Sequence, residues 1–126
     1  MIELRKERIW QDFKKIRRAW PDAMLSQTFR FVLIPGINLP EQFNYSTTPL
    51  LIKLNPDSDY KEPESYVRRE LRVNGRKSRH LDEKLTDPEM LDSGWVKLCV
   101  RVHWNKNLSL IDYLIMALEF LEGLRE

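Results

Sequence analysis

Residues 94–104 read GWVKLCVRVHW and are the most informative stretch of the chain, because they contain its only cysteine. It is short, largely apolar and rich in valine, which predicts an extended segment over residues 95–102. An amphipathic helix follows it over residues 108–124, with Ser109 or Asn107 as its cap. The apolar residues that share one face of this helix are Leu108, Ile111, Leu114, Ile115, Leu118, Leu121 and Leu124.

The chain begins with a second amphipathic helix, which we predict over residues 3–20. Pro21 ends it, because proline cannot continue a helix. Its apolar stripe is formed by Ile9, Trp10, Phe13, Ile16 and Trp20, and we expect all four tryptophans of the chain to be core or half-buried.

Three apolar runs between the helices predict strands over residues 28–34, 49–54 and 65–73. Pro35-Gly36 should end the first strand, and Asn74-Gly75 predicts a turn after the third. Residues 76–93 are polar and predict a long loop, with a short helix near residues 87–91. Strands grouped between terminal helices indicate an α+β fold with an antiparallel sheet, and the length of 126 residues fits one domain over residues 1–126.

Composition excludes several classes of protein. Hydrophobic residues make up 42% and charged residues 32%, which is typical of a globular chain and not of a disordered one. The 21 basic and 19 acidic residues give a net charge of only +2, so we do not expect nucleic-acid binding. No apolar run approaches the ~20 residues that span a bilayer, and the charged start has no apolar signal region. A single cysteine without an export signal predicts a cytoplasmic protein that does not bind a membrane.

Cys99 is the only cysteine, so it is either a small core residue or a reactive thiol. Alternation in an extended segment places Lys97, Cys99 and Arg101 on one face, which favours the reactive thiol. The basic neighbours Lys97, Arg101, His103 and Lys106 are expected to lower its pKa. We expect no metal and no cofactor, because His80, His103 and Cys99 are too few and too scattered for a zinc motif, and we expect His80 to be solvated.

The order of these elements resembles the E2 ubiquitin-conjugating enzymes, whose fold is called UBC. Pro56, Tyr60 and Pro63 are spaced as in the proline–tyrosine segment that follows the third strand in that family. Cys99, Trp104 and the helix from Leu108 then follow in the family's order. The resemblance covers about residues 3–124 and is closest to E2-like proteins of bacterial operons, many of which act in antiphage defence.

The resemblance implies a UBC-like fold, with an N-terminal helix, an antiparallel β-meander, a long loop that carries the catalytic cysteine, and a C-terminal helix. It also implies that an E1-like activating enzyme passes a ubiquitin-like protein, or the C-terminus of another protein such as a nucleotidyltransferase, to Cys99 as a thioester. The supporting residues would be Arg101, His103, Trp104 and Asn105, with His103, Asn105 and Asn107 as candidate oxyanion donors. The residues that would dock on the activating enzyme are Arg5, Arg8, Lys15 and Arg18.

The chain departs from the family at two places. It lacks the His-Pro-Asn motif that precedes the cysteine, and Trp104 follows Cys99 more closely than in the family. Two alternatives therefore stay open. One is a catalytically inactive E2 variant that binds protein partners and uses Cys99 for packing. The other is a small basic module that binds nucleic acid through the cluster at residues 68–79, which contains Arg68, Arg69, Arg72, Arg76, Lys77 and Arg79.

Overall fold

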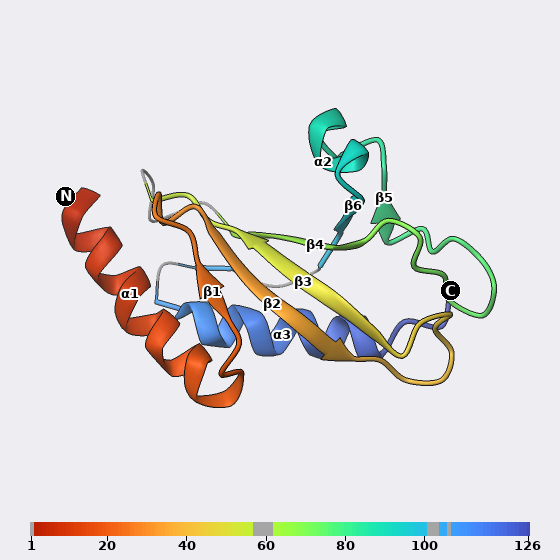
Figure 1. Cartoon of the computed structure of the whole chain (residues 1–126), viewed down its shortest axis with the longest axis horizontal. Helices are drawn as coiled ribbons and strands as arrows, with labels where there is room; N and C mark the ends of the chain where they lie inside the picture. Colours follow the sequence, from red (N-terminus) through yellow and green to blue (C-terminus); the bar gives the residue numbers. More distant parts are fainter. Residues whose placement is uncertain (1, 57–61, 101–103, 106) are drawn as a thin grey trace.

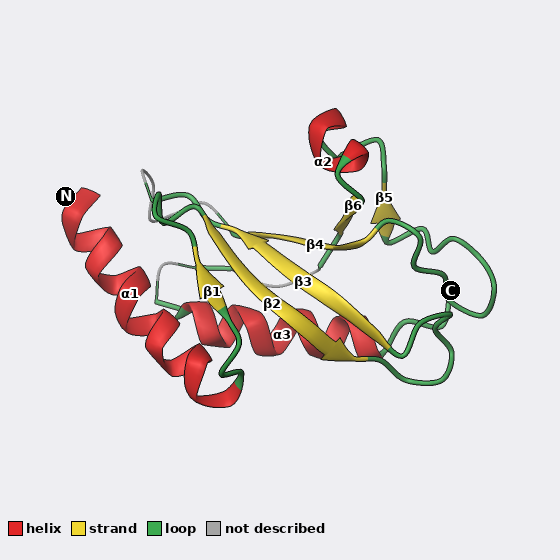
Figure 2. Cartoon of the chain, viewed as in Figure 1, coloured by secondary structure: helices red, strands yellow, loops and turns green. Residues whose placement is uncertain are grey.

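The computed structural model describes residues 2–56, 62–100, 104–105 and 107–126, with only the backbone for residues 2–4. Within them the fold is α+β, with an N-terminal helix, an antiparallel sheet and a C-terminal helix, as the sequence predicted (Figures 1 and 2). The sheet has six strands, where the sequence predicted three and one extended segment. The elements in chain order are α1 (Ile2–Ala19), β1 (Met24–Leu25), β2 (Phe31–Asn38), β3 (Thr47–Lys53), β4 (Glu64–Arg68), β5 (Leu81–Asp82), α2 (Pro88–Asp92), β6 (Trp95–Leu98) and α3 (Leu110–Glu122).

The strands lie in the order β1-β2-β3-β4-β6-β5, so the segment before Cys99 is a strand of the sheet. β6 pairs with β4 on one side and with the short β5 on the other. α3 lies along one face of this sheet (Figure 1). Side chains alternate along each strand, and those that turn toward the core are fully buried. These residues are Val32, Ile34, Leu50, Ile52, Val67, Val96 and Leu98.

The buried face of α3 is rotated from the predicted stripe. Its buried residues are Leu110, Tyr113, Leu114, Ala117 and Leu121. Ile115 is 46% exposed, so its placement in the core was wrong. The small side chain of Ala117 faces the core, which allows the helix to approach the sheet there. The start of α3 is fixed as predicted by Ser109, whose hydroxyl accepts from the Asp112 amide in a capping box.

α1 confirms the predicted helix and is fixed to the start of α3. The buried carboxylate of Asp12 accepts a hydrogen bond from the Leu110 amide at 3.0 Å, and Arg8 donates to the Leu108 carbonyl at 2.8 Å. Phe13 and Ile16 are buried beneath the helix. Trp10 is 39% exposed and lies beside Phe13, which corrects its assignment to the core stripe. Because Phe13 and Ile16 fill the interface, Trp10 remains at its edge.

β2 does not end at Pro35-Gly36. The strand continues to Asn38 through a register shift between Ile34 and Ile37, which is a bulge. Proline has no N–H to donate to a neighbouring strand. On the β1 side of β2 this causes no loss, because β1 pairs only with Val32 and Leu33 and ends before Pro35. β2 also begins later than predicted, because the Ser26 hydroxyl accepts from the Arg30 and Phe31 amides and holds residues 26–30 in a turn.

The third predicted strand is shorter than expected, and the polar region after it is more ordered than a loop. β4 ends at Arg68, while Val73 bridges to Arg76 across the predicted turn, in which Asn74 and Gly75 have positive φ of 51° and 77°. Residues 76–93 contain β5 and the predicted short helix α2, whose cap is Asp87. The long loop predicted there is therefore interrupted by a two-residue strand, in addition to the predicted short helix. None of the helices in the described part of the chain is long and apolar enough to cross a membrane.

The contact between Asp12 and Leu110 yields the first prediction. Asp12→Ala leaves a buried amide without its acceptor and should lower the free energy of unfolding by about 1–3 kcal/mol. Urea denaturation measures this loss. Gln11→Ala, on the exposed side of the same helix, is the control and should change the free energy by about 0.5 kcal/mol or less. Equal losses in the two variants would contradict the role given to Asp12.

Candidate functional site

Cys99 lies directly after the last residue of β6 and is half-buried. Its amide donates to the His80 carbonyl at 2.8 Å, and the Val100 amide turns back to the Leu98 carbonyl at 2.9 Å. The strand therefore ends at Leu98, short of the segment predicted over residues 95–102. Arg101 and His103 lie outside the described residues, as does Lys106, so their predicted roles stay predictions.

Lys97 is held in place by groups from three neighbouring segments. Its amide donates to the buried Thr86 hydroxyl at 2.9 Å, and Thr86 in turn donates to the Asp82 carbonyl at 2.7 Å. Its ammonium lies 3.5 Å from a Glu64 oxygen, whose partner oxygen accepts from the Tyr66 hydroxyl at 2.7 Å. Burial alone would raise the pKa of Glu64, but the Tyr66 hydroxyl and the nearby lysines hold it below its ordinary value. Glu64 is therefore ionised at neutral pH and keeps Lys97 beside it.

The electrostatic environment of Cys99 differs from the one predicted. Burial raises the pKa of its thiol. Lys97 acts in the predicted direction and lowers the pKa, while Asp82 raises it again. Among the described residues the net result is a thiol with a raised pKa. The lowering expected from Arg101, His103 and Lys106 stays a prediction, because these residues lie outside the described part of the chain. Desolvation at the end of a buried strand raises the pKa of the thiol by more than Lys97 lowers it. Lys97 is itself paired with Glu64.

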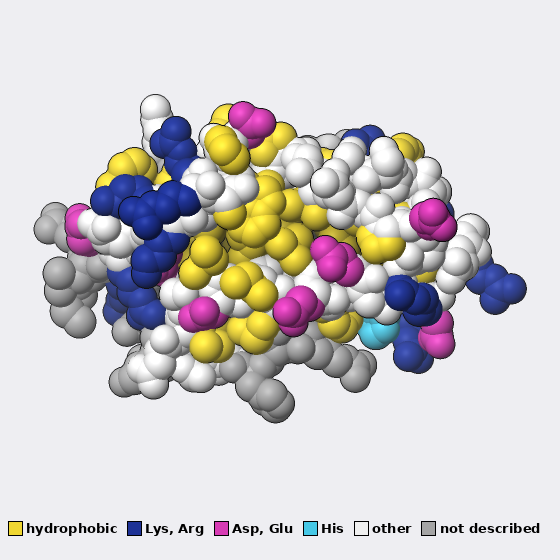
Figure 3. All heavy atoms as spheres, turned by 90° about the horizontal axis from the view of Figure 1, so that it is seen from below, with side chains coloured by type: hydrophobic (Ala, Val, Ile, Leu, Met, Phe, Trp, Pro, Cys, Tyr) yellow, Lys and Arg dark blue, Asp and Glu magenta, His cyan; other side chains and the backbone are white. Residues whose placement is uncertain are grey.

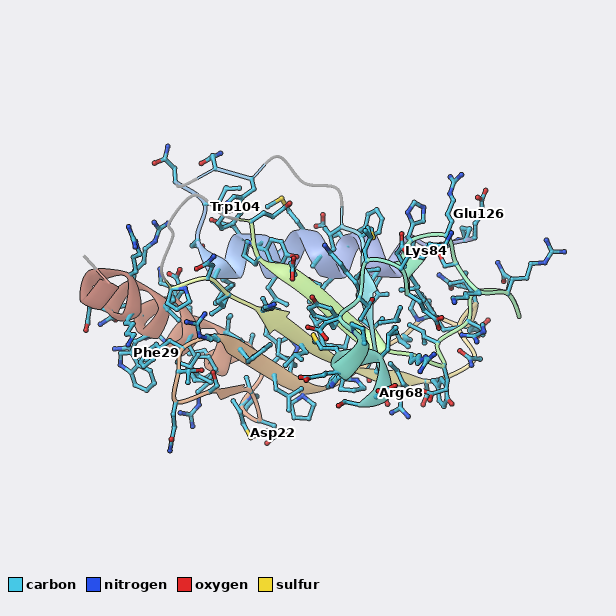
Figure 4. All side chains as sticks on the ribbon, turned by 90° about the horizontal axis from the view of Figure 1, so that it is seen from above. Asp22, Phe29, Arg68, Lys84, Trp104 and Glu126 are labelled. Atoms are coloured by element: carbon cyan, nitrogen blue, oxygen red, sulfur yellow. The ribbon has the colours of Figure 1, made fainter. Side chains whose placement is uncertain are left out.

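Trp104 belongs to the packing of α3. Its indole meets the ring of Tyr113 edge to face, with centroids 5.9 Å apart, and Figure 4 shows it beside the N-terminal half of the helix. The Tyr113 hydroxyl lies 2.7 Å from the Ser65 hydroxyl, and both residues are fully buried. The Trp104 Nε1 is buried without a hydrogen-bond partner among the residues that the structure describes. These contacts attach the segment after Cys99 to the junction between β4 and α3.

Asn105 shapes the turn before α3. Its side-chain oxygen accepts from the Asn107 amide at 2.8 Å, and its carbonyl accepts from the Leu108 amide at 3.1 Å. The side chain is exposed. A turn-forming role of this kind is common for asparagine, and it engages the oxygen of the side chain and not the NH₂ group that was predicted to donate to an oxyanion.

His80 is a neighbour of Cys99 that the sequence analysis missed. The residue is half-buried, and its ring meets Phe120 edge to face at 5.2 Å, so the prediction of a solvated side chain was wrong. It reaches Cys99 through its backbone, because β5 places residues 80–82 against β6. Its side chain lines an open cavity of ≈ 370 Å³ with Arg79, Phe120 and Arg125. Within the described chain, no group of three or more His, Cys, Asp or Glu side chains is placed to hold a metal ion.

The four cations predicted to dock on a partner recur along one side of α1, at positions 5, 8, 15 and 18. Arg8 is tied to the Leu108 carbonyl, and Arg5 is half-buried. Lys15 and Arg18 are exposed farther along the helix. Arg8, Lys15 and Arg18 are thus the exposed members of the predicted docking set, and Arg8 is also held by its hydrogen bond.

The basic cluster at residues 68–79 is largely used within the fold. Arg69 and Lys77 share the carboxylate of Glu83, at 3.3 and 3.0 Å. Arg72 donates to two backbone carbonyls, and the Arg68 guanidinium lies 4.6 Å from the centre of the Tyr45 ring. These contacts fix the positions of the side chains within the fold, and Glu83 offsets one of the two charges of Arg69 and Lys77.

In comparisons with known proteins, no family model, no curated sequence and no solved structure matched this chain.

The raised pKa of Cys99 yields the second prediction. In the folded protein, the rate of alkylation by iodoacetamide should rise with pH about a midpoint above that of the same chain unfolded in guanidinium. The pH of this midpoint reports the pKa of the thiol. The accessibility of the thiol changes only the maximal rate of alkylation. Lys97→Gln should move the midpoint farther up, because it removes the cation that favours the thiolate. Lys84→Gln, an exposed residue beyond β5, is the control. A folded midpoint at or below the unfolded one would contradict this description of the site.

Proposed function

We propose that this protein is an E2-like conjugating protein of the UBC type that carries a ubiquitin-like modifier, or the C-terminus of another protein, on Cys99. The observation that carries the proposal is the position of Cys99. The chain's only thiol lies at the end of a sheet strand, is partly accessible, and precedes the helix that crosses the sheet. This order of elements supports the resemblance seen in the sequence. The proposed setting is a cytoplasmic, bacterial antiphage defence system.

The proposed chemistry is two successive acyl transfers. The Cys99 thiolate attacks the thioester carbonyl on the activating enzyme, so that a new S–C bond forms and the enzyme's own thiolate leaves. An amine of the target then attacks the carbonyl, its N–C bond forms, the Cys99 thiolate leaves and the amine loses a proton. Lys97 supports the first step, because it is the described cation that favours the thiolate.

The partners of this reaction remain proposals. An E1-like enzyme would use ATP to activate the modifier, and Arg8, Lys15 and Arg18 are the exposed cations that support its docking on α1. Arg5 completes the proposed contact only if the partner also reaches the side of α1 that faces α3. No metal or cofactor enters the chemistry of this chain.

A second candidate is the inactive variant that binds protein partners without carrying them. The raised pKa of Cys99 favours it, since a protonated thiol is a weak nucleophile. In this candidate Cys99 is a packing residue at the end of β6.

The third prediction separates the two candidates. The protein is mixed with an E1-like activating enzyme, its ubiquitin-like modifier, ATP and magnesium, and its intact mass is recorded. A carrier should gain the mass of one modifier, and dithiothreitol should remove it. Cys99→Ala should show no gain. Cys99→Ser, the closest replacement, should form an ester that dithiothreitol leaves intact.

The activating enzyme provides its own control, because it must form its own thioester with the modifier in the same mixture. If it does so and the protein gains no mass, the carrier proposal is wrong. The binding module then predicts that calorimetry detects the same affinity for the modifier or activating enzyme in the native protein and in Cys99→Ala.

A further inference from the structure

The helix α1 carries the excess positive charge of this protein. Residues 1–20 contain seven basic and three acidic side chains, a balance of +4, whereas residues 21–126 contain fourteen basic and sixteen acidic ones, a balance of −2. Figure 3 shows Lys and Arg side chains gathered over α1 at one end of the molecule, with a second group at the opposite end. The net charge of +2, from which we expected no nucleic-acid binding, averages over this separation.

The exposed cations of α1 cover its outermost line and both of its flanks. They are Arg8, Lys14, Lys15, Arg17 and Arg18. Lys14 and Arg18 lie one turn apart on the outermost line, opposite the buried Ile16. The guanidinium of Arg17 lies on one flank, 5.9 Å from the centre of the Phe13 ring.

The other flank of α1 faces the start of α3. Here Arg8 donates to the Leu108 carbonyl at 2.8 Å, and Lys15 follows two turns later. The exposed carboxylates of this region are Glu7, near the N-terminus of α1, and Asp112, which is close enough to attract Lys15. Residues 13–19 themselves contain four cations and no carboxylate, so the positive charge is densest in the last two turns of the helix.

The surface between these cations lacks the apolar centre that a protein partner needs. Phe13 and Ile16 are buried beneath the helix, and the exposed positions beside the cations include Gln11 and Ala19, with Trp10 on the flank of Arg17. The centre of a typical protein interface is apolar and depleted in lysine, whereas a phosphate backbone is bound mainly through lysine and arginine. The exposed side of α1 therefore fits a polymer of phosphates better than a protein.

The spread of the cations over both flanks distinguishes a groove from a flat surface. A helix that lies on an anionic bilayer brings only its outermost line to the lipid headgroups, because the bilayer is flat. The major groove of duplex DNA is about 12 Å wide, and an α-helix with its side chains is about 10–12 Å in diameter. A helix along this groove has a row of phosphates on each side. α1 lies at the periphery of the fold (Figure 1), where a long partner can reach it.

We propose that α1 binds the backbone of double-stranded DNA along the major groove, independently of base sequence. Arg17 contacts one row of phosphates, Arg8 and Lys15 contact the other, and Lys14 and Arg18 lie between the two rows. The proposal does not rest on the carrier function of Cys99. Because Lys15 and Arg18 also belong to the proposed docking surface for the activating enzyme, DNA and that enzyme would exclude each other.

The fourth prediction concerns the affinity of the full chain for a fluorescein-labelled DNA duplex of mixed sequence, measured by fluorescence anisotropy. With about four phosphate contacts, the affinity should fall about 10²-fold between about 50 and 200 mM salt. The variant with Lys14→Gln, Lys15→Gln, Arg17→Gln and Arg18→Gln should lose binding. The matched control, with Arg76→Gln, Lys77→Gln, Arg79→Gln and Arg125→Gln, removes as many exposed cations elsewhere and should keep most of its affinity.

A milder variant keeps the test decisive if thermal melting shows that the quadruple variant does not fold. Lys14→Gln with Arg18→Gln should reduce the slope of log Kd against log salt by about two, one for each lost phosphate contact. A native protein that does not bind the duplex at about 50 mM salt would overturn the proposal. So would a matched control that loses as much affinity as the α1 variant, because binding would then follow the net charge.

Two other polyanions distinguish DNA from the alternative partners of a basic helix. Polyglutamate represents an acidic protein, and vesicles of phosphatidylserine and phosphatidylcholine represent a membrane. The native protein should bind the duplex more tightly than either, because only the duplex places phosphates against both flanks of α1. It should also bind the duplex more tightly than the single strand of the same sequence, which has no groove. Equal or tighter binding of polyglutamate, of the vesicles or of the single strand would contradict the proposal.

Discussion

The hydrogen bond between Ser65 of β4 and Tyr113 of α3 is the contact on which the rest of this structure depends. The two hydroxyls lie 2.7 Å apart, and both residues are fully buried. A buried hydroxyl without a partner is costly, so this pair fixes how α3 lies on the centre of the sheet. Trp104 packs on the same tyrosine, and β6 pairs with the same strand as Ser65. The segments before and after Cys99 therefore converge on this contact.

The position of Cys99 explains its chemistry. A residue that directly follows a buried strand is partly withdrawn from water, and burial raises the pKa of a thiol. The cation that opposes this effect, Lys97, is shared with Glu64. Any activation of the thiol must therefore come with the approach of a partner or from groups beyond the described residues. This requirement would suit a carrier that reacts only when its activating enzyme is bound.

The sequence predicted those parts of the structure that depend on local patterns. The periodicity of Phe13 and Ile16 located α1, Ser109 located the start of α3, and Asn74-Gly75 located a turn with two positive φ angles. The predictions failed where pairing at long range overrides a local signal. Pro35-Gly36 is a strand breaker by composition, yet a bulge on a sheet edge accommodates it.

The candidate site was less predictable than the fold. Cys99 and Lys97 are close in sequence, but His80 and Glu64 reach them only through the pairing of β6 with β5 and β4. No periodic pattern in the polar region around His80 indicates a two-residue strand. In the same way, the basic run at residues 68–79 gives no sign in sequence that Arg69 and Lys77 both pair with Glu83.

A double-mutant cycle on Ser65 and Tyr113 tests the central claim most directly. Ser65→Ala and Tyr113→Phe should each lower the free energy of unfolding by about 1–3 kcal/mol, because each leaves the other hydroxyl buried and unpaired. The double variant removes both hydroxyls, so it should lose clearly less than the sum of the two single losses. Strictly additive losses would show that the two hydroxyls are independent and that another contact fixes α3 on the sheet.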